Sequence, residues 1–321
     1  MTLFVYSLLA FILSLGIVIF IMPFWIDYLK KVSFNQNVSE YSLQEYKDKA
    51  KTPIMGGVIF ILVPVFLTIL FNWNQLHSLR LWILLLSFVG YGLIGFVDDY
   101  LIVVKHNNDG LKPRYKFLLQ VLLAIIFFLI YQREADLSIT LLFSKRIIPL
   151  GIFYGPLVLL MFSGASNAVN LTDGMDGLAA GCMVTALVPF WIYALIQKEF
   201  GIAVFVAALL GALFGYLKFN IKPAKIFMGD TGSLALGAVL AALAMLLKKE
   251  MALIVIGGIF VIETLCVMIQ IGSVKLRGKR VFPYTPIHYA FVIKGMGERQ
   301  VVHWFWLVSL GFAIIGFFLG L

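Results

Sequence analysis

Charged side chains are scarce in this chain of 321 residues. They make up only 13% of the sequence, whereas hydrophobic residues make up 62% and the mean hydropathy is +1.00. A soluble domain carries about 25% charged residues, so this chain has too few to cover a water-exposed surface. Apolar runs of about 18 or more residues recur, which is the length that a helix needs to cross a bilayer. The composition excludes a soluble protein and indicates an integral membrane protein.

Cysteine is also scarce, which excludes a disulfide-stapled fold. Cys182 and Cys266 both lie inside apolar runs, where a thiol packs as a small side chain and neither a disulfide nor a metal pair is indicated. The net charge of +9 does not indicate nucleic-acid binding, because no basic segment is long or separate enough to form a binding module. In a membrane protein this excess is typical of cytoplasmic loops and of attraction to anionic lipids and phosphates.

We predict an all-α, polytopic membrane protein with about ten transmembrane helices, folded as a single domain over residues 1–321. The segment 133–150 is too polar to span, and its alternating apolar residues predict a short external β-hairpin. Gly211 and Gly215 are spaced for a close contact between helices. The predicted helices cover residues 3–27, 54–71, 80–104, 115–132, 151–169, 177–197, 200–217, 232–248, 251–272 and 301–320.

The basic residues predict which side of the membrane each loop faces. Most of the 25 lie in one of the two alternating sets of loops, which the positive-inside rule assigns to the cytoplasm. Lys30 and Lys31 close the first apolar run and no basic residue precedes it, so it is expected to be an anchor rather than a signal peptide. Both termini are then external. The inner loops are residues 28–53, 98–116, 170–176, 218–231 and 273–300, and the outer basic residues are Arg80, Arg133, Lys145, Arg146, Lys198, Lys248 and Lys249.

Acidic residues are rarer than basic ones, and five of them gather at the predicted inner ends of helices. Asp98 and Asp99 are adjacent near the end of a predicted helix, where they repel each other and oppose the helix dipole. A divalent cation would relieve both costs, so this pair is expected to be functional rather than a solvated helix end. The other three carboxylates belong to Asp173, Asp176 and Asp230.

Two short motifs surround these three carboxylates. Residues 167–177 join two predicted helices and space Asn170, Asp173 and Asp176 by three, so that a helical turn would place them on one face. Residues 227–233 precede a predicted helix, whose N-terminus favours an anion such as phosphate. Helix capping is the alternative for both motifs. In the first motif capping explains one residue but not two amides, two carboxylates and two glycines together.

Basic residues on the same side complete a candidate phosphate site. Lys49 and Lys51 precede the stretch 52–57, Lys116 opens a predicted helix, and Lys225 lies just before the second motif. Each is also explained by the positive-inside rule. Together with the carboxylates they predict a magnesium–diphosphate site, because Mg²⁺ in proteins is bound by one or two carboxylates plus substrate phosphates. Such an ion would neutralise charge on a leaving nucleotide.

The last inner loop, residues 273–300, carries closely spaced basic residues and then a Pro-Ile pair followed by His288. A lone histidine is usually structural or exposed, and a substrate contact is the competing hypothesis. Glu263 and Gln270 lie in the preceding predicted helix. They are expected to make polar contacts that face the bundle or its cavity.

In order along the chain, these motifs resemble the bacterial phospho-N-acetylmuramoyl-pentapeptide transferase family. The resemblance implies ten helices, magnesium, and a cytoplasm-facing cleft in the bacterial cytoplasmic membrane. It implies transfer of phospho-N-acetylmuramoyl-pentapeptide from UDP to undecaprenyl phosphate, which gives lipid I and UMP for peptidoglycan synthesis. A homodimer is left open. The matching segments are Thr-Pro-Ile-Met-Gly-Gly at 52–57, Asp98-Asp99, Asn167–Gly177, Phe227–Ser233 and Pro286-Ile287-His288.

The resemblance also implies roles for individual residues. Asp98, Asp99 and Asp230 would be the catalytic carboxylates, with Asp230 holding magnesium. Asp98 would either take a proton from the lipid phosphate in a direct displacement or act as the nucleophile of a covalent two-step route. His288 is expected to be catalytic. The resemblance places Lys116 near the phosphates and Asn170, Asp173, Asp176, Asn220 and Phe227 around the nucleotide. From their positions in the sequence, substrate binding is also expected of Lys49, Lys225 and Gln270.

The chain departs from the family pattern at two places. Three consecutive histidines are usual after Pro-Ile, but here Tyr289 and Ala290 follow His288. An earlier inner loop has Lys51 where glycine is usual and Tyr46 where histidine is usual. Two alternatives remain: a related transferase that moves N-acetylhexosamine phosphate from UDP to a polyprenyl phosphate, and a membrane transporter. A transporter is expected to place its charged sites near the bilayer midplane, whereas the polar groups here gather at helix ends.

Overall fold

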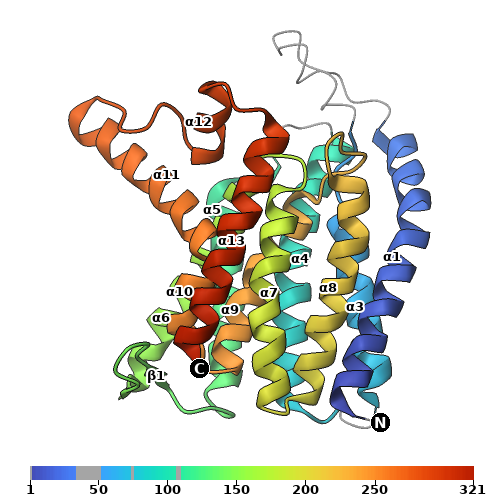
Figure 1. The fold of residues 1–321 in the computed structure, drawn as a ribbon, viewed down its shortest axis with the longest axis vertical. Coiled ribbons are helices and arrows are strands. Elements are labelled where there is room, and N and C mark those ends of the chain that lie inside the picture. Colours follow the sequence, from blue (N-terminus) through green and yellow to red (C-terminus); the bar gives the residue numbers. More distant parts are fainter. Residues whose placement is uncertain (1, 34–51, 74–75, 106–109) are drawn as a thin grey trace.

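The computed structural model describes residues 2–33, 52–73, 76–105 and 110–321, and most of them are helical. In Figure 1 the long helices run side by side along one direction and form a bundle. The helices are α1 (Leu3–Ser33), α3 (Gly57–Phe71), α4 (Leu79–Lys105), α5 (Pro113–Tyr131), α6 (Tyr154–Thr172), α7 (Leu178–Ile196), α8 (Phe200–Asn220), α9 (Gly229–Leu246), α10 (Glu250–Ile256), α11 (Gly258–Arg277), α12 (Ile287–Ile293) and α13 (Glu298–Gly320), with a short 3-10 helix at Gly151–Phe153.

Among the described residues, 9 helices are long and apolar enough to cross a membrane. They are α1, α4, α5, α6, α7, α8, α9, α11 and α13. The helix α3 is equally apolar but has only 15 residues, which is shorter than a typical span. The predicted multi-pass helical architecture is confirmed, with one of the ten predicted spans present as this shorter helix.

One predicted helix, residues 251–272, is divided in the structure. The helices α10 and α11 meet at Gly257, whose φ of −85° and ψ of 20° leave the helical region. Two adjacent glycines weaken a helix, and the ring of Phe312 occupies the place that a side chain at Gly258 would need. The prediction of one continuous helix was therefore wrong, and α11 leans away from the bundle in Figure 1. The short helix α12 lies in a segment that was predicted as loop.

The helices α8 and α9 form the centre of the bundle, and nearly all of their side chains are buried. Small residues let neighbouring helices approach them closely. A Cβ on Gly211 would overlap the backbone of Phe11 on α1, and one on Gly237 would overlap the backbone of α6. A Cβ on Gly215 would press against Val18 of α1. The predicted close contact at Gly211 and Gly215 is thus confirmed.

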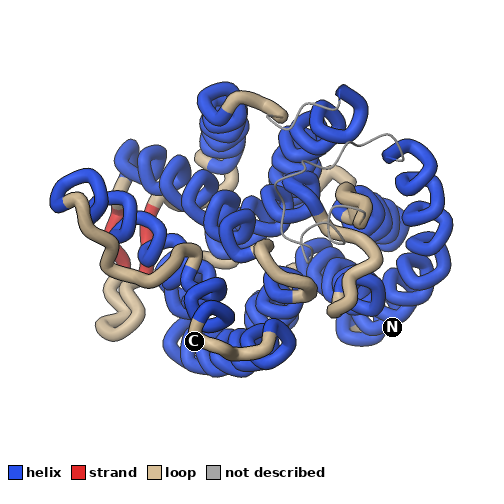
Figure 2. The backbone as a smooth tube through the Cα atoms, turned by 90° about the horizontal axis from the view of Figure 1, so that it is seen from above, coloured by secondary structure: helices blue, strands red, loops and turns tan. Residues whose placement is uncertain are grey.

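The predicted hairpin is present as two short antiparallel strands, β1 (Ser138–Thr140) and β2 (Ile147–Pro149). Seen from above in Figure 2, the strands lie at one edge of the molecule, away from the N-terminal helix. The Lys248 ammonium joins the hairpin to the bundle, because it donates to the carbonyl of Asp136 at 2.8 Å and pairs with the buried carboxylate of Glu250 at 3.3 Å. The start of α1 and the end of α13 lie at the same end of the bundle as β1, opposite α12 (Figure 1).

Candidate active site

Three carboxylates converge where the last turns of α4 meet the first turn of α9. Asp98 and Asp99 lie on α4 and are buried, and Asp230 is the second residue of α9 and is partly buried. Their oxygen atoms lie within 4.8 Å of one another. The structure therefore brings the three predicted catalytic carboxylates together at the end of the bundle that is opposite the termini.

Asp99 tethers the start of α9. Its Oδ1 accepts the backbone N–H of Asp230 at 3.0 Å, and its Oδ2 accepts the backbone N–H of Thr231 at 3.0 Å and the Thr231 hydroxyl at 2.6 Å. The first N–H groups of a helix have no partner within it, so a carboxylate is favoured there by hydrogen bonding and by the helix dipole. Gly229 has a φ of +70°, and a Cβ on it would overlap the Asp99 carboxylate. The glycine of this motif therefore makes the tether possible.

Lys116, near the start of α5, places a positive charge between two of the carboxylates. Its ammonium lies 3.1 Å from Asp98 Oδ1 and donates a hydrogen bond to Asp230 Oδ2. Asp98 Oδ1 also accepts the backbone N–H of Leu111 at 2.9 Å, which fixes the side chain that faces the lysine. The ammonium shows that a cation is stabilised between Asp98 and Asp230.

Asn170 and Asp173 reach the same cluster from the end of α6. The Asn170 amide donates to Asp230 Oδ1 at 2.6 Å and to the Ser233 hydroxyl at 2.9 Å. Burial, followed by the charges of the nearby aspartates, raises the pKa of Asp173 well above its ordinary value. The repulsion between Asp173 and the neighbouring aspartates adds to the effect of burial, and a bound cation would reduce that repulsion.

A cavity of about 420 Å³ opens beside the carboxylates. Asp99 and Asp230 border it on one side, and the segment Asp173–Asp176 borders it from the α6–α7 connection. Phe227 lines it from the segment before α9 and offers an aromatic face. The cavity thus combines an acidic wall, an aromatic side chain and a nearby lysine, which is a suitable set for a nucleotide with a metal-bound diphosphate.

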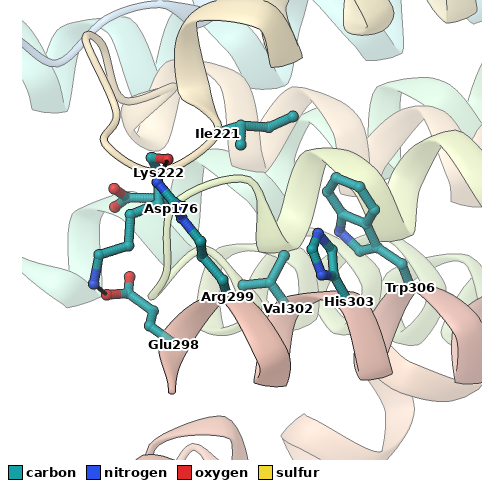
Figure 3. A pocket seen from close by; sticks show the side chains of 8 residues that line it. All are labelled: Asp176, Ile221, Lys222, Glu298, Arg299, Val302, His303 and Trp306. Carbon is teal, nitrogen blue, oxygen red and sulfur yellow. Dashed lines mark hydrogen bonds and ion pairs between the residues drawn. The ribbon is translucent and has the colours of Figure 1, made fainter.

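A second cavity, of about 340 Å³, shares Asp176 with the acidic cavity (Figure 3). Lys222 forms an ion pair with Glu298 at its mouth, and the Arg299 guanidinium donates to the Lys222 carbonyl at 2.8 Å. Trp306 closes the inner side, and its indole N–H donates to the carbonyl of Gly177 at 3.1 Å. Asp176, on the α6–α7 connection, therefore lines both an acidic cavity and one that carries both signs of charge.

Two residues that were expected to bind substrate, Asn220 and Lys225, do not line the acidic cavity. Asn220 is buried and holds two loops together, since its amide donates to the Ile226 carbonyl at 2.9 Å and accepts the Gly177 N–H at 3.0 Å. Lys225 is exposed on the connection between α8 and α9. Lys49 lies outside the residues that the structure describes.

Gln270 on α11 also faces protein rather than the cavity. Its side-chain oxygen accepts the backbone N–H groups of Val281 at 2.9 Å and of Phe282 at 3.0 Å, and its amide donates to the Phe282 carbonyl at 3.0 Å. These three bonds fold the segment after α11 back onto the helix. Gln270 therefore shapes the segment that follows α11.

The helix α12 brings the Pro-Ile-His motif against the Asp173–Asp176 segment. The Tyr289 hydroxyl donates to the carbonyl of Gly174 at 2.9 Å, and Tyr289 lines the acidic cavity. His288 is fully buried behind Gly174 and pairs with Glu263 of α11. The sequence pointed to Glu263 as a carboxylate inside the membrane, but its partner is 25 residues away and no local pattern connects the two.

The residues of the cluster fit a magnesium ion. Asp98, Asp99 and Asp230 form an oxygen-only set, and hard oxygen ligands are those that Mg²⁺ prefers. The Lys116 ammonium between Asp98 and Asp230 marks where positive charge is held. Because both oxygens of Asp99 accept hydrogen bonds from the start of α9, Asp230, the predicted metal ligand, is better placed than Asp99 to hold a metal ion.

A glycine on α4 sets how closely Asp230 approaches the α4 carboxylates. A Cβ on Gly95 would overlap the backbone of Asp230 and Thr231. We expect Gly95→Ala to cost about 1–3 kcal/mol of stability by overpacking and to lower the transfer activity that the resemblance implies, because the start of α9 must move. Thermal unfolding in detergent measures the first effect, and an assay of turnover measures the second. Gly90→Ala is the matched control, since a Cβ there meets only the Leu123 side chain; unchanged values for Gly95→Ala would contradict the close approach.

Comparison with known proteins shows the family to which the chain belongs. Residues 81–248 match glycosyl transferase family 4, and the chain belongs to this family. The phospho-N-acetylmuramoyl-pentapeptide-transferase of Halalkalibacterium halodurans is 44% identical over 97% of both chains. Relatives of the same name from Bacillus mycoides and Bacillus thuringiensis are 43% and 44% identical over 97% of this chain and 95% of their own. The resemblance inferred from the motifs is confirmed.

Proposed function

We propose that this chain transfers phospho-N-acetylmuramoyl-pentapeptide from UDP to undecaprenyl phosphate, which gives lipid I and UMP. The observation that carries the proposal is the 44% identity to a transferase of that name over 97% of both chains. The site supports it, because an acidic cavity at the end of a membrane bundle lets a lipid phosphate meet a soluble nucleotide. A lipid phosphate oxygen bonds to the phosphorus that carries the sugar, and the bond from that phosphorus to the UMP oxygen breaks.

The acidic cavity faces the cytoplasm of a bacterial cell in this proposal. The relatives are bacterial, and most basic residues lie in the loops that share this end of the bundle. The short helix α3 completes a tenth span, and both termini are external together with the hairpin. A cysteine introduced at Ser144, in a variant without the native thiols, should react with a membrane-impermeant maleimide from outside. Labelling from inside alone would reverse the orientation.

Mg²⁺ held by Asp230 would neutralise charge on the diphosphate and on the departing UMP. The chain's own residues supply the rest. Lys116 adds a positive charge beside the phosphates, and Asn170 fixes the Asp230 carboxylate through its amide. Asp99 holds the backbone of Asp230 in place. Positioning and fixed charge are the main contributions that a protein makes to phosphoryl transfer.

Asp98 has one of two roles, and they differ in a measurable way. As a base it takes the proton of the lipid phosphate, and no UMP leaves without lipid. As a nucleophile it attacks the donor phosphorus first, and one UMP per enzyme leaves before lipid is added. A single-turnover experiment without undecaprenyl phosphate separates the two routes.

The donor lies in the acidic cavity with its nucleotide near Phe227, Asp173 and Asp176, all of which line that cavity. Asn220 and Gln270 act on the substrate through the loops that they hold. Lys49 and Lys225 remain contacts predicted from the basic residues of the sequence. A homodimer is a separate proposal, and light scattering of the detergent-solubilised protein tests it.

The choice of donor tests the proposed function. Purified protein with Mg²⁺ and undecaprenyl phosphate is expected to release UMP from UDP-N-acetylmuramoyl-pentapeptide and not from UDP-N-acetylglucosamine. Release from the second donor alone would assign the chain to the N-acetylhexosamine branch. If folded protein released no UMP from either donor, that result would overturn the transferase proposal and favour the transporter alternative.

A further inference from the structure

A carboxylate in the second turn of the membrane helix α11 organises the start of α12. The Glu263 side chain is completely buried, at 0% exposure, although an isolated charge there is costly. Three hydrogen-bond donors converge on it. Its Oε2 accepts the backbone N–H of Ile287 at 2.7 Å, and its Oε1 accepts the backbone N–H of His288 at 3.2 Å and His288 Nδ1 at 3.0 Å. Glu263 thus satisfies the first turn of α12 and the histidine ring together.

These contacts fix the tautomer and direction of the His288 ring. Because the carboxylate can only accept hydrogen bonds, Nδ1 carries the proton, and the neutral ring has a bare Nε2. Among the described residues Nε2 has no hydrogen-bond partner. It lies against Gly174, where an added Cβ would overlap it. A ring without a hydrogen on Nε2 fits this close contact better than one with a hydrogen there.

The ring is separated from the acidic cavity by the chain it supports. Gly174 and Tyr289 line the cavity, whereas His288 is 0% exposed and does not. Tyr289 lies on the same turn of α12 as His288, and its hydroxyl donates a hydrogen bond to the Gly174 carbonyl. The segment Asp173–Asp176 is therefore held at Gly174 by two consecutive residues of α12. Tyr289, one of the departures from the family pattern, takes part in this contact.

We propose that Glu263 is a positioning residue for donor binding. Through His288 it holds the segment Asp173–Asp176 at the depth from which Asp173 and Asp176 meet the donor. The proposal rests on the proposed function, since the donor is UDP-N-acetylmuramoyl-pentapeptide. The proposal assigns no contact with undecaprenyl phosphate to this segment. Loss of the Glu263–His288 contact should therefore weaken binding of the donor and leave binding of undecaprenyl phosphate unchanged.

Glu263→Gln is the direct test, because no orientation of the amide can accept all three donors. The amide N–H₂ must face a backbone N–H or force the His288 proton onto Nε2, against Gly174. We expect the donor KM to rise by at least about tenfold, with kcat and the lipid KM within about threefold of the wild type. The exposed Glu134→Gln is the matched control and should leave all three unchanged.

Gly174→Ala disturbs the contact between Gly174 and His288 from the cavity side, without a change inside a membrane helix. Its Cβ would meet the Tyr289 hydroxyl at 2.8 Å and His288 Cε1 at 2.9 Å. We expect the same rise in donor KM. In the double variant with His288→Ala, the effects should be less than additive, because both changes disrupt one contact.

The results separate this inference from the proposed function. An unchanged donor KM in folded Glu263→Gln, or in Gly174→Ala where Glu263→Gln does not fold, would overturn the positioning role. So would a fall in kcat with both KM values unchanged, since that would place the pair in the chemical step. Absence of UMP release by the wild type would instead refute the proposed function itself.

Discussion

Asp230→Asn should lower UMP release by about 100- to 1,000-fold while the protein remains folded. Asp230 accepts hydrogen bonds from Lys116 on one oxygen and from Asn170 on the other. Asparagine has nearly the same shape, but it removes a negative charge and turns an N–H₂ toward one of these two donors. The measurement is the initial rate of UMP release at saturating donor, lipid and Mg²⁺, together with thermal unfolding in the same detergent.

The control for this change is an aspartate outside the site. Asp27 is exposed on α1, and Asp27→Asn should leave both the rate and the unfolding temperature unchanged. Binding of Mn²⁺, followed by electron paramagnetic resonance without substrate, gives a second readout and should weaken in Asp230→Asn only. A well-folded Asp230→Asn protein with nearly normal turnover would remove Asp230 from the reaction.

The convergence of the carboxylates was predictable because each lies at the end of a helix. A helix that spans the bilayer brings its end to one surface, so residues far apart in sequence meet there once the spans are counted. Asp98, Asp173 and Asp230 were placed on one side in this way, and the structure brings them to one cavity and its border. The hydropathy pattern predicted the membrane-spanning helices, and the few acidic residues at the ends of those helices predicted the site.

Partners inside the bundle were not predictable by the same means. Gln270 and Asn220 carry amides that suit a substrate, but the structure directs both to backbone groups of loops. An amide has the same appearance in the sequence whether it meets a ligand or a carbonyl, because both satisfy the same donors and acceptors. The break at Gly257 was missed for a related reason, since the apolar pattern continues across it.

The hydrogen-bond partners of Asp99, within the site, were also not predictable from the sequence. Adjacent aspartates indicate a shared function, and the sequence assigned both to catalysis. In the structure Asp98 faces Lys116, whereas Asp99 faces the first turn of α9. Consecutive residues on a helix point about 100° apart, so two neighbours need not share a partner. The different roles of Asp98 and Asp99 become apparent only from the position of α9 in the structure.

Asp99→Asn should therefore impair the reaction by a different route from Asp230→Asn. Both oxygens of Asp99 accept hydrogen bonds, from the Asp230 N–H, the Thr231 N–H and the Thr231 hydroxyl. An asparagine must turn its N–H₂ toward one of these donors, and leaving a buried polar group unpaired costs about 1–3 kcal/mol. We expect UMP release to fall by about 100-fold or more and the unfolding temperature to fall as well, because the start of α9 shifts and takes Asp230 with it.

Thr231→Val provides the graded comparison, since it removes only the hydroxyl bond and leaves both backbone bonds to Asp99 in place. Its loss of UMP release should be about tenfold or less, with a smaller fall in unfolding temperature. The decisive quantity is the unfolding temperature of Asp99→Asn without metal. If it equals that of the wild type while turnover is lost, Asp99 acts on the substrate itself. If it falls together with the affinity for Mn²⁺, the carboxylate works by holding α9, and the adjacent pair combines one chemical residue with one that positions its partner.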